Sequence, residues 1–261
     1  MIEESNGPRI LLLDIETAPV LGWSWKFYDI NLIDTLRDWT LLCYGAQWIV
    51  DGVEQKPFVH GIDRPKDLFS FIKNPRNDEK IVKEIWHLLD QADYVVAHNG
   101  NSFDLKKVTS RFLTYGLGPP SPYKQIDTLQ TVKRISQNTR NNQGVLLKEW
   151  GIGFKMENEG FPLWLKYMGG EPKAIKKMHA YNRQDVVGLL GLFKHLRPWI
   201  KMNHGMYTLG TVCPHCGSRS LQKRGIKTNN TTEYHQIFCN DCRGWSRSTV
   251  NERETKPLIA L

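Results

Sequence analysis

The feature that most constrains this chain is an apolar run near its start that ends on an acid. Residues 9–14, RILLLD, place four consecutive apolar side chains before Asp14. Such a run is typical of a central strand that is buried on both faces of a sheet. Glu16 follows two positions later, and alternate residues of a strand share a face. The run therefore predicts a strand end that presents two acids together, where they either bind a divalent cation or remain solvated at a turn.

The segments that follow predict a mixed α/β fold. Residues 41–50 and 53–60 are rich in strand-forming residues, and Asp-Gly between them is a strong hairpin signal. The first three strands should therefore form an antiparallel meander. Residues 18–40 are aromatic-rich and are expected to be irregular. Helical spacing, strand-like runs and the proline-rich stop GPPSP predict the remaining elements: helices at 65–73, 78–90 and 104–115, strands at 94–97 and 124–128, and mostly helix up to 196.

Composition excludes some classes of protein and leaves a nucleic-acid partner open. No stretch approaches the roughly 20 apolar residues that span a bilayer, and the polar N-terminus lacks the apolar segment of a secretion signal. A cytoplasmic protein is the expectation. The formal net charge is +8, and residues 204–261 hold 8 Lys/Arg against 4 Asp/Glu. Such a balance is compatible with a polyanionic partner but does not establish one.

Two further acids follow elements that should reach the same edge of the sheet. Asp104 comes after the predicted strand at 94–97 and the loop HNGNSF. Asp185 lies four residues after Tyr181, so both occupy one helical face. Taken alone, Asp185 would be read as an exposed helix residue. An acid among apolar residues is costly unless it is paired or bound to a metal, so the combination favours a shared site.

Together these segments resemble the DEDD exonucleases of the RNase H-like superfamily, in the tyrosine-containing DEDDy branch. LLLDIETAP, AHNGNSFDLKKVTSR and YNRQDVV match its three motifs in order, within residues 9–200. The resemblance is greatest to phage and bacterial relatives of the proofreading domain of family B DNA polymerases. It implies an RNase H-like mixed five-stranded sheet flanked by helices. It also implies hydrolysis of phosphodiester bonds from the 3′ end of nucleic acid, with DNA favoured.

The resemblance further implies which residues carry the reaction. Two Mg²⁺ or Mn²⁺ ions, roughly 3.5–4 Å apart, would activate the attacking water and stabilise the leaving oxygen. Hard cations prefer carboxylate and phosphate oxygens. Tyr181 would orient the water, because a phenol with a pKa near 10 is a poor base. Asp14 would bridge the two ions, and the other ligands would be Glu16, Asp104 and Asp185.

Asn99 and Phe103 match positions that, by the same resemblance, contact the terminal nucleotide. For Phe103, stacking on a base and anchoring its helix in the core both remain open. Structural roles are favoured for five other residues. His98 is expected to form a hydrogen bond at a strand end, and Asp127 to have a structural role at a strand end, although Asp127 also resembles an acid of related enzymes. Arg111 is expected to be a surface or salt-bridging helix residue, with phosphate contact as the alternative. For Trp23 and Trp25, core packing is favoured over a substrate channel.

Four of the five cysteines form two Cys-x-x-Cys pairs near the C-terminus. The pairs are separated by 22 residues, a spacing that suits a closed tetrahedral zinc site. A redox-active dithiol pair is the alternative. His215 lies inside the first pair and is not an expected ligand, and Cys43 is expected to be buried. The predicted zinc ligands are Cys213, Cys216, Cys239 and Cys242.

The segment between the two pairs predicts a β-hairpin that carries both basic and aromatic side chains. Nucleic-acid binding is favoured for this zinc ribbon, and a structural or protein-docking role is the alternative. The basic residues are Arg219, Lys223, Arg224 and Lys227, and the aromatic residues are Tyr234, Phe238 and Trp245.

The sequence therefore predicts an exonuclease domain at 1–203 and a zinc ribbon with its tail at 204–261. Its expected partners are single-stranded nucleic acid or 3′ ends, and proteins of replication or repair. The sequence contains no polymerase domain, so a proofreading role would require such a partner. A structure-selective endonuclease on the same fold is one rival interpretation. Another is an inactive nuclease domain that serves as a zinc-dependent binding module, although the complete set of four acids argues against it.

Overall fold

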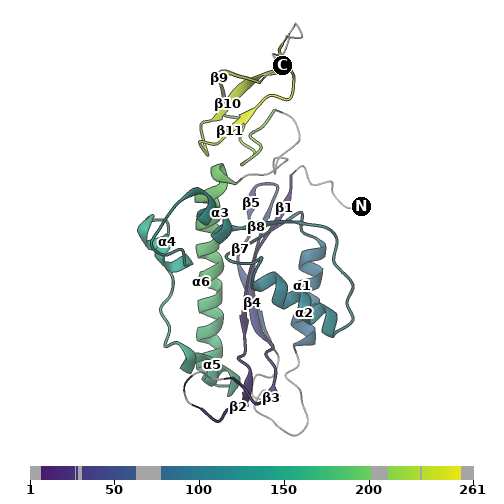
Figure 1. The fold of residues 1–261 in the computed structure, drawn as a ribbon, viewed down its shortest axis with the longest axis vertical. Coiled ribbons are helices and arrows are strands. Elements are labelled where there is room, and N and C mark those ends of the chain that lie inside the picture. The colour runs from purple at the N-terminus through teal and green to yellow at the C-terminus, as the bar shows by residue number, and fades with distance from the viewer. Residues whose placement is uncertain are drawn as a thin grey trace.

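A six-stranded mixed sheet lies at the centre of the N-terminal part of the chain (Figure 1). The computed structural model describes residues 7–26, 28, 31–62, 78–200, 211–229 and 231–253. The strand order is β5-β4-β1-β7-β8, and β6 also pairs with β4. β1 is antiparallel to β4 and parallel to β7. The strands are β1 (Arg9–Thr17), β4 (Leu41–Val50), β5 (Val53–Glu54), β6 (Phe58–Gly61), β7 (Tyr94–Ala97) and β8 (Lys124–Asp127).

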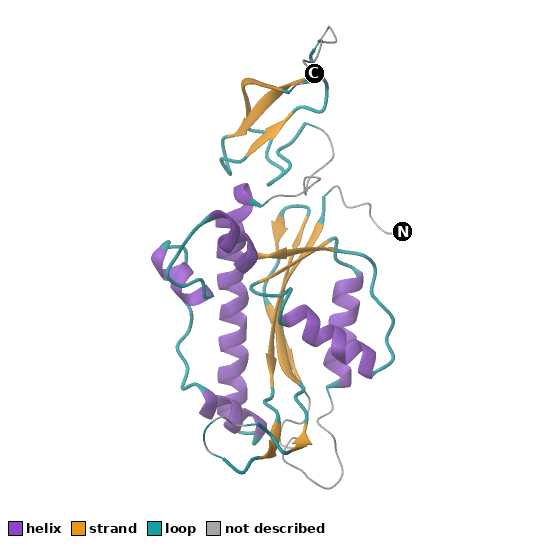
Figure 2. Ribbon diagram, in the orientation of Figure 1, coloured by secondary structure: helices purple, strands orange, loops and turns teal. Residues whose placement is uncertain are grey.

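Helices cover both faces of this sheet (Figure 2). The long helix α6 lies along one face, and α1 and α2 lie on the other. These positions agree with the predicted helices at 78–90 and 104–115 and with the mostly helical segment after 128. The helices are α1 (Glu79–Asp90), α2 (Asp104–Thr114), α3 (Thr128–Ile135), α4 (Gln143–Glu149), α5 (Phe161–Met168) and α6 (Pro172–Leu196), with a short 3-10 turn at Arg197–Trp199.

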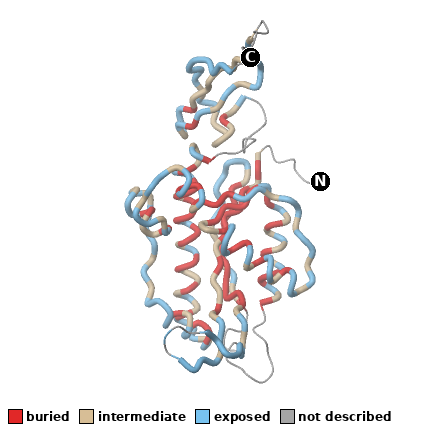
Figure 3. Tube along the Cα trace, viewed as in Figure 1, coloured by how far each residue is buried: buried red, intermediate tan, exposed pale blue. Residues whose placement is uncertain are grey.

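Most residues of the first strand are buried, as its apolar run predicts (Figure 3). Leu11 and Leu13 pack in one core with residues of α1 and α2. Ile10 and Leu12 pack in a second core with residues of α6. Each such buried side chain contributes on the order of 2 kcal/mol to folding. Because strand residues alternate, the even-numbered residues that follow, including the two acids, lie on the face that α6 covers.

The predicted hairpin at Asp51-Gly52 is confirmed. Val50 pairs with Val53, and both turn residues have positive φ, at 53° and 81°. This conformation matches the twist of the flanking strands. The third predicted strand is interrupted, however, and forms β5 and β6 on either side of 55–57. Pro57 lacks the amide donor that a continuous ladder needs, which accounts for six strands instead of five.

Two other predictions differ from the structure or lie outside it. Residues 18–40 are not irregular throughout, because β2 (Leu21–Trp23) and β3 (Asp34–Arg37) pair in a two-stranded sheet. The predicted helix at 65–73 lies outside the described residues, as does the predicted domain boundary at 203/204. Across the described helices, none has the length and apolar character needed to cross a membrane.

A separate three-stranded antiparallel sheet contains the predicted C-terminal hairpin. Its order is β11-β10-β9, with β9 (Leu221–Thr228), β10 (Glu233–Cys239) and β11 (Trp245–Arg247). The pairing of β9 with β10 shifts between His235 and Ile237. Gly225, with φ of 82°, lies opposite this shift, where a bulge places an extra residue in a left-handed conformation.

Candidate metal-binding sites

Asp14 and Glu16 lie where β1 runs past the end of its neighbour β7. The parallel pairing of these strands covers only Ile10, Leu11 and Leu12. Beyond it, the backbone N–H of Ile15 donates to Oδ1 of Asp104, at 3.1 Å. Asp104 is the first residue of α2 and is buried. Because β7 does not pair with β1 beyond Leu12, Asp104 at the start of α2 can contact β1, which carries Asp14 and Glu16.

Asp185 comes to the same place from α6, and it is also buried. Ligand oxygens of Asp14, Glu16 and Asp185 all lie within 4.8 Å of one another. Asp104 is not part of this tight group, but its charge raises the pKa of Asp14. The structure therefore brings the four predicted acids into one neighbourhood and gathers three of them closely.

Burial raises the pKa of each of these carboxyl groups, and repulsion from the other acids adds to the rise at Asp14 and Glu16. The pKa of Asp14 is held well above its usual range by burial and then by the other three acids. The pKa of Glu16 rises to about 8, through burial and then Asp185, while Lys155 opposes the rise. Burial raises the pKa of Asp104 to about 7, although the N–H of Ile15 lowers it. Burial also raises the pKa of Asp185.

The donor set fits a hard divalent cation. Oδ1 of Asp185 is buried and has no hydrogen-bond partner among the described residues. Carboxylate oxygens that converge without enough donors are costly as anions in a protein interior. A Mg²⁺ or Mn²⁺ ion prefers such oxygens and favours their charged forms. The arrangement has the chemistry of a carboxylate metal site, with Asp14, Glu16 and Asp185 as its core.

Tyr181 lies one helical turn before Asp185 and is also buried. Burial, and then the charge of Asp185, raise the pKa of its phenol to about 12, while Lys155 opposes the rise. Its ring packs edge-on against Trp164, with 6.3 Å between centroids. The phenol is thus protonated at neutral pH and held in place beside the acids.

Two polar residues of this site, Lys155 and Asn182, were not predicted from the sequence. Nζ of Lys155 lies 3.1 Å from Oδ2 of Asp185 and 5.0 Å from the centre of the Tyr181 ring. Asn182 donates from Nδ2 to Oδ2 of Asp14, at 2.6 Å. Asn182 precedes Asp185 by three positions, so helical spacing could have indicated it. Lys155 lies in an irregular segment between α4 and α5, where no periodic signal exists.

The residues with a predicted nucleotide contact flank the site. Asn99 has a left-handed backbone, with φ of 70°, and its N–H donates to Oδ1 of Asp127 at 3.0 Å. Phe103 directly precedes α2, and its side chain is 39% exposed. Nζ of Lys107 lies 5.7 Å from its ring centre. Because Phe103 is not enclosed in the core, its ring is accessible, and its contact with a nucleotide stays a prediction.

The structural roles predicted for His98, Asp127 and Arg111 agree with their contacts. The two ring nitrogens of His98 lie 2.9 Å from Oγ1 of Thr128 and 3.0 Å from the carbonyl of Asn141. Asp127 caps α3 and accepts from two backbone amides of the loop after β7. Arg111 forms a buried salt bridge with Asp78. None of these contacts requires a ligand.

Core packing was the wrong prediction for Trp23 and Trp25, which are 62% and 89% exposed. Both lie at or beside β2, which pairs with β3 and not with the central sheet. A two-stranded sheet of this kind buries little of its own side chains. The burial expected of large aromatic residues therefore does not apply here.

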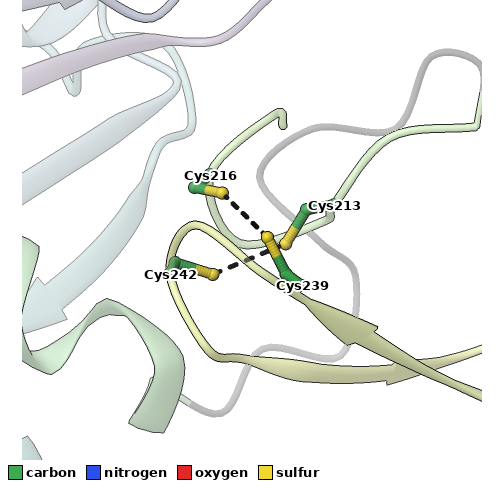
Figure 4. A group of neighbouring side chains, drawn as sticks. All are labelled: Cys213, Cys216, Cys239 and Cys242. Atoms are coloured by element: carbon green, nitrogen blue, oxygen red, sulfur yellow. Dashed lines mark hydrogen bonds between the residues drawn. The ribbon is translucent and has the colours of Figure 1, made fainter. Parts of the chain in front are cut away.

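The four predicted zinc ligands form a second cluster, in which all four sulfur atoms lie within 4.8 Å of one another (Figure 4). The Sγ atoms of Cys213 and Cys242 are 3.7 Å apart, as are those of Cys216 and Cys239. A tetrahedral site with Zn–S bonds of about 2.3 Å has sulfur atoms about 3.8 Å apart. The free thiols therefore have the spacing of a zinc site and not of disulfides.

Local contacts around the cysteines also suit a structural zinc site. Burial raises the pKa of Cys216 to about 11, whereas N–H groups at 241 and 242 outweigh burial and lower the pKa of Cys239. The N–H of Gly244 points at Sγ of Cys242, at 3.4 Å. His215 is outside the cluster, with Nε2 at 3.2 Å from the carbonyl of Trp245. Cys43 is buried in the core of the central sheet.

Comparisons with known proteins agree with this fold. The family model described as RNase_H superfamily matches residues 58–197, more than half of the chain. That range contains Asp104, Tyr181 and Asp185 but not the two acids of β1. A search of curated proteins found no match.

Among solved structures, the family B DNA polymerase from the hyperthermophilic archaeon Pyrobaculum calidifontis is similar, with a TM-score of 0.52 and 18% sequence identity. The match covers 73% of this chain and 25% of that chain. At this identity the likeness concerns the fold alone, and the present chain spans about a quarter of the polymerase.

Proposed function

Because the chain belongs to the RNase_H superfamily, we propose that it is a metal-dependent nuclease acting as a 3′–5′ exonuclease, with DNA favoured over RNA. The observation that carries the proposal is the convergence of Asp14, Glu16 and Asp185 within 4.8 Å, beside Asp104. The fold likeness to a family B DNA polymerase supports DNA as the substrate.

The proposed reaction joins water to phosphorus and breaks the bond to the 3′ oxygen, releasing a nucleoside 5′-monophosphate. Asp14, Glu16, Asp104 and Asp185 would hold Mg²⁺ or Mn²⁺, as in the two-ion sites of other nucleases. When bound, such ions make water more acidic and stabilise negative charge on the leaving oxygen. The carboxylates must be ionised for this role, and a cation favours that form.

Tyr181 and Lys155 have roles that follow from their protonation. The phenol of Tyr181 has a pKa of about 12, so it orients the attacking water by hydrogen bonding and does not take its proton. The pKa of Lys155 is raised, because Asp185 and the hydroxyl of Tyr181 outweigh the opposing effect of burial. Its ammonium group therefore stays charged and is available to a phosphate oxygen beside Asp185.

The test is cleavage of end-labelled single-stranded and duplex DNA and RNA with Mg²⁺, Mn²⁺ or EDTA. We expect metal-dependent release of mononucleotides, and we expect a blocked 3′ end, but not a blocked 5′ end, to prevent it. Equal degradation of both blocked substrates into oligonucleotides would favour the endonuclease alternative. No cleavage of any substrate with either metal would favour the binding-module alternative.

For the zinc ribbon we propose a supporting role in holding nucleic acid, with Zn²⁺ bound by its four cysteines. The guanidinium of Arg224 lies 4.4 Å from the centre of the Phe238 ring, and that of Arg247 lies 4.0 Å from Tyr234. Trp245 is 51% exposed and packs against Phe238 at 5.1 Å between centroids.

This basic and aromatic face suits a single strand. Tyr234 and Phe238 lie on the same face of β10, because alternate residues of a strand share a face. Trp245 pairs with Phe238 and Arg247 pairs with Gln236, so both extend this face, and Arg224 reaches the Phe238 ring from β9. Aromatic rings stack on bases of any sequence, and arginines bind phosphate. Neither Arg224 nor Arg247 has a carboxylate partner among the described residues. A partner from DNA replication or repair stays a prediction.

A further inference from the structure

Asn182 is a fully buried amide that contacts the central acid of the candidate site. It lies on α6, and its Nδ2 is 2.6 Å from Oδ2 of Asp14 and 3.4 Å from the backbone carbonyl of Asp14. An ionised carboxylate only accepts hydrogen bonds, so the nitrogen and not the oxygen of the amide must face it. The contact therefore fixes both the amide and one carboxylate oxygen.

The amide has a structural cost. Its Oδ1 is buried and has no hydrogen-bond partner among the described residues. A buried, unpartnered oxygen destabilises a fold, whereas an apolar side chain of similar size would avoid this cost. What the amide adds at this position, and leucine would not, is the N–H group that it donates to Asp14.

Gly45 makes the contact possible. It pairs directly with Asp14 across β4 and β1. A Cβ at this position would lie 2.7 Å from Oδ1 of Asn182 and 2.7 Å from Cγ2 of Val186, both too close for non-bonded atoms. Only glycine therefore lets α6 approach the sheet closely enough for the amide to reach the acid.

We propose that Asn182 is a positioning residue, which holds the Asp14 carboxylate ready for a cation in the space that Gly45 leaves. The N–H donates to Oδ2, and no hydrogen bond joins the other oxygen of Asp14 to any described residue. Because the amide is neutral, it orients Asp14 without cancelling the charge that attracts a cation, in contrast to Lys155 beside Asp185. This inference rests on the proposed metal site. Partners that orient metal ligands typically affect metal affinity by about 10- to 100-fold.

The test measures Mn²⁺ binding to the zinc-loaded full-length protein by calorimetry or electron paramagnetic resonance. Asn182→Leu and Gly45→Ala should each weaken Mn²⁺ binding by about tenfold or more. They should also lower kcat and raise the Mn²⁺ concentration that cleavage requires, with little change in KM for nucleic acid. Gly61→Ala is the matched control, because its Cβ would crowd Tyr167 and His179 at 2.5 and 2.6 Å, away from the acids.

The outcomes separate this inference from the proposed function. If Asp14→Asn binds Mn²⁺ as well as the unchanged protein does, the proposed metal site itself is wrong. If Asp14→Asn loses binding while Asn182→Leu and Gly45→Ala retain it, Asn182 does not position Asp14. Equal weakening in Gly61→Ala would also overturn the inference, since it would show a general response to crowding between helix and sheet. Gly45→Ala keeps the test available if Asn182→Leu fails to fold.

Discussion

The carboxylate site and the cysteine cluster both have the chemistry of metal sites, but they are assembled in opposite ways. The hydrogen bond between Asn182 and Asp14 joins residues 168 positions apart, across the sheet and its longest helix. The sulfur contacts of the cysteine cluster join residues only 29 and 23 positions apart. The acids therefore come together only when distant parts of the chain pack into the core, whereas the cysteines come together within one short segment.

The comparison also shows what a metal ion would contribute to each site. The acids lie beside two large apolar cores, whose burial can stabilise the domain without a metal. A cation there is added to a folded domain and relieves repulsion between its ligands. The ribbon has almost no buried side chains apart from Cys213 and Cys239. Its folding should depend on the metal, as in other small zinc units.

The largest expected effect is loss of the ribbon fold on removal of zinc. Chelation should unfold residues 211–253, because zinc binding supplies on the order of 10 kcal/mol to such units. The thermal midpoint of the central sheet should hardly change. Metal analysis should find one zinc per chain, lost in Cys239→Ala and kept in Cys43→Ala, whose thiol lies outside the cluster. If the ribbon keeps its fold and its protection from amide hydrogen exchange without zinc, its folding does not depend on the metal and the two sites do not differ in this respect.

The second effect is on catalysis. Asp14→Ala or Asp185→Asn should lower the cleavage rate by at least about 1,000-fold, roughly 4 kcal/mol of barrier, because each removes a proposed metal ligand. Zinc content and the circular dichroism spectrum should stay the same. Glu149→Gln, which changes an exposed carboxylate of α4, is the control and should keep full activity. Normal cleavage by either site variant would contradict the assignment of the acids.

The third effect distinguishes these acids from one that serves the fold. Asp78 is buried like them, but it accepts from Nε of Arg111 at 2.9 Å, from the hydroxyl of Tyr115 at 2.6 Å and from the N–H of Leu41 at 2.8 Å. Asp78→Ala should therefore lower the free energy of unfolding by about 3 kcal/mol, since Arg111 would remain buried without its partner. Urea unfolding measures this change, and a loss below about 1 kcal/mol would contradict it.

The fourth effect is the pH dependence of stability in the absence of Mg²⁺ and Mn²⁺. Glu16 and Asp104 have folded pKa values of about 8 and 7, above their unfolded values near 4. The folded state therefore binds more protons than the unfolded state between about pH 4 and pH 8. Ionisation of these two groups should therefore lower the stability of the folded state as pH rises across this window.

Two controls accompany this pH series, which is followed by thermal unfolding of the zinc-loaded protein. Added Mn²⁺ should restore stability near pH 8, because the cation favours the ionised acids. Glu16→Gln should flatten the pH profile, since it removes one of the titrating groups. A profile that rises between pH 5 and pH 8 would contradict the raised pKa values of Glu16 and Asp104.

The smallest effect concerns the face of the ribbon. Arg224→Ala and Arg247→Ala should each weaken binding to single-stranded DNA by about 1 kcal/mol and reduce its salt dependence. Arg253→Ala is the matched control, because Arg253 is paired with Glu233 at 3.1 Å. Equal losses in all three variants would point to net charge and not to this face. No loss in any of them would favour a structural or protein-docking ribbon.

The sequence by itself determined much of the central fold. Continuous apolar runs located β1 and β7, helical spacing located α1, the GPPSP stretch located the end of α2, and Asp51-Gly52 located the turn between β4 and β5. These features are local, since they depend on side-chain periodicity and on backbone preferences of a few adjacent residues. The cysteine spacing is local for the same reason. The prediction of one continuous strand at 53–60 was incomplete, because the strand is interrupted at Pro57. The prediction of core packing for Trp23 was wrong, because its strand does not join the central sheet.

Only the tertiary structure decided how the acids are surrounded. Nothing in the irregular segment around Lys155 indicates that its ammonium group reaches Asp185. The sequence of β1 likewise does not show that Gly45 leaves the space in which Asn182 contacts Asp14. Such contacts depend on how a helix crosses a sheet and how a loop returns to it. These paths are set by packing among many distant side chains, so no short sequence window contains them.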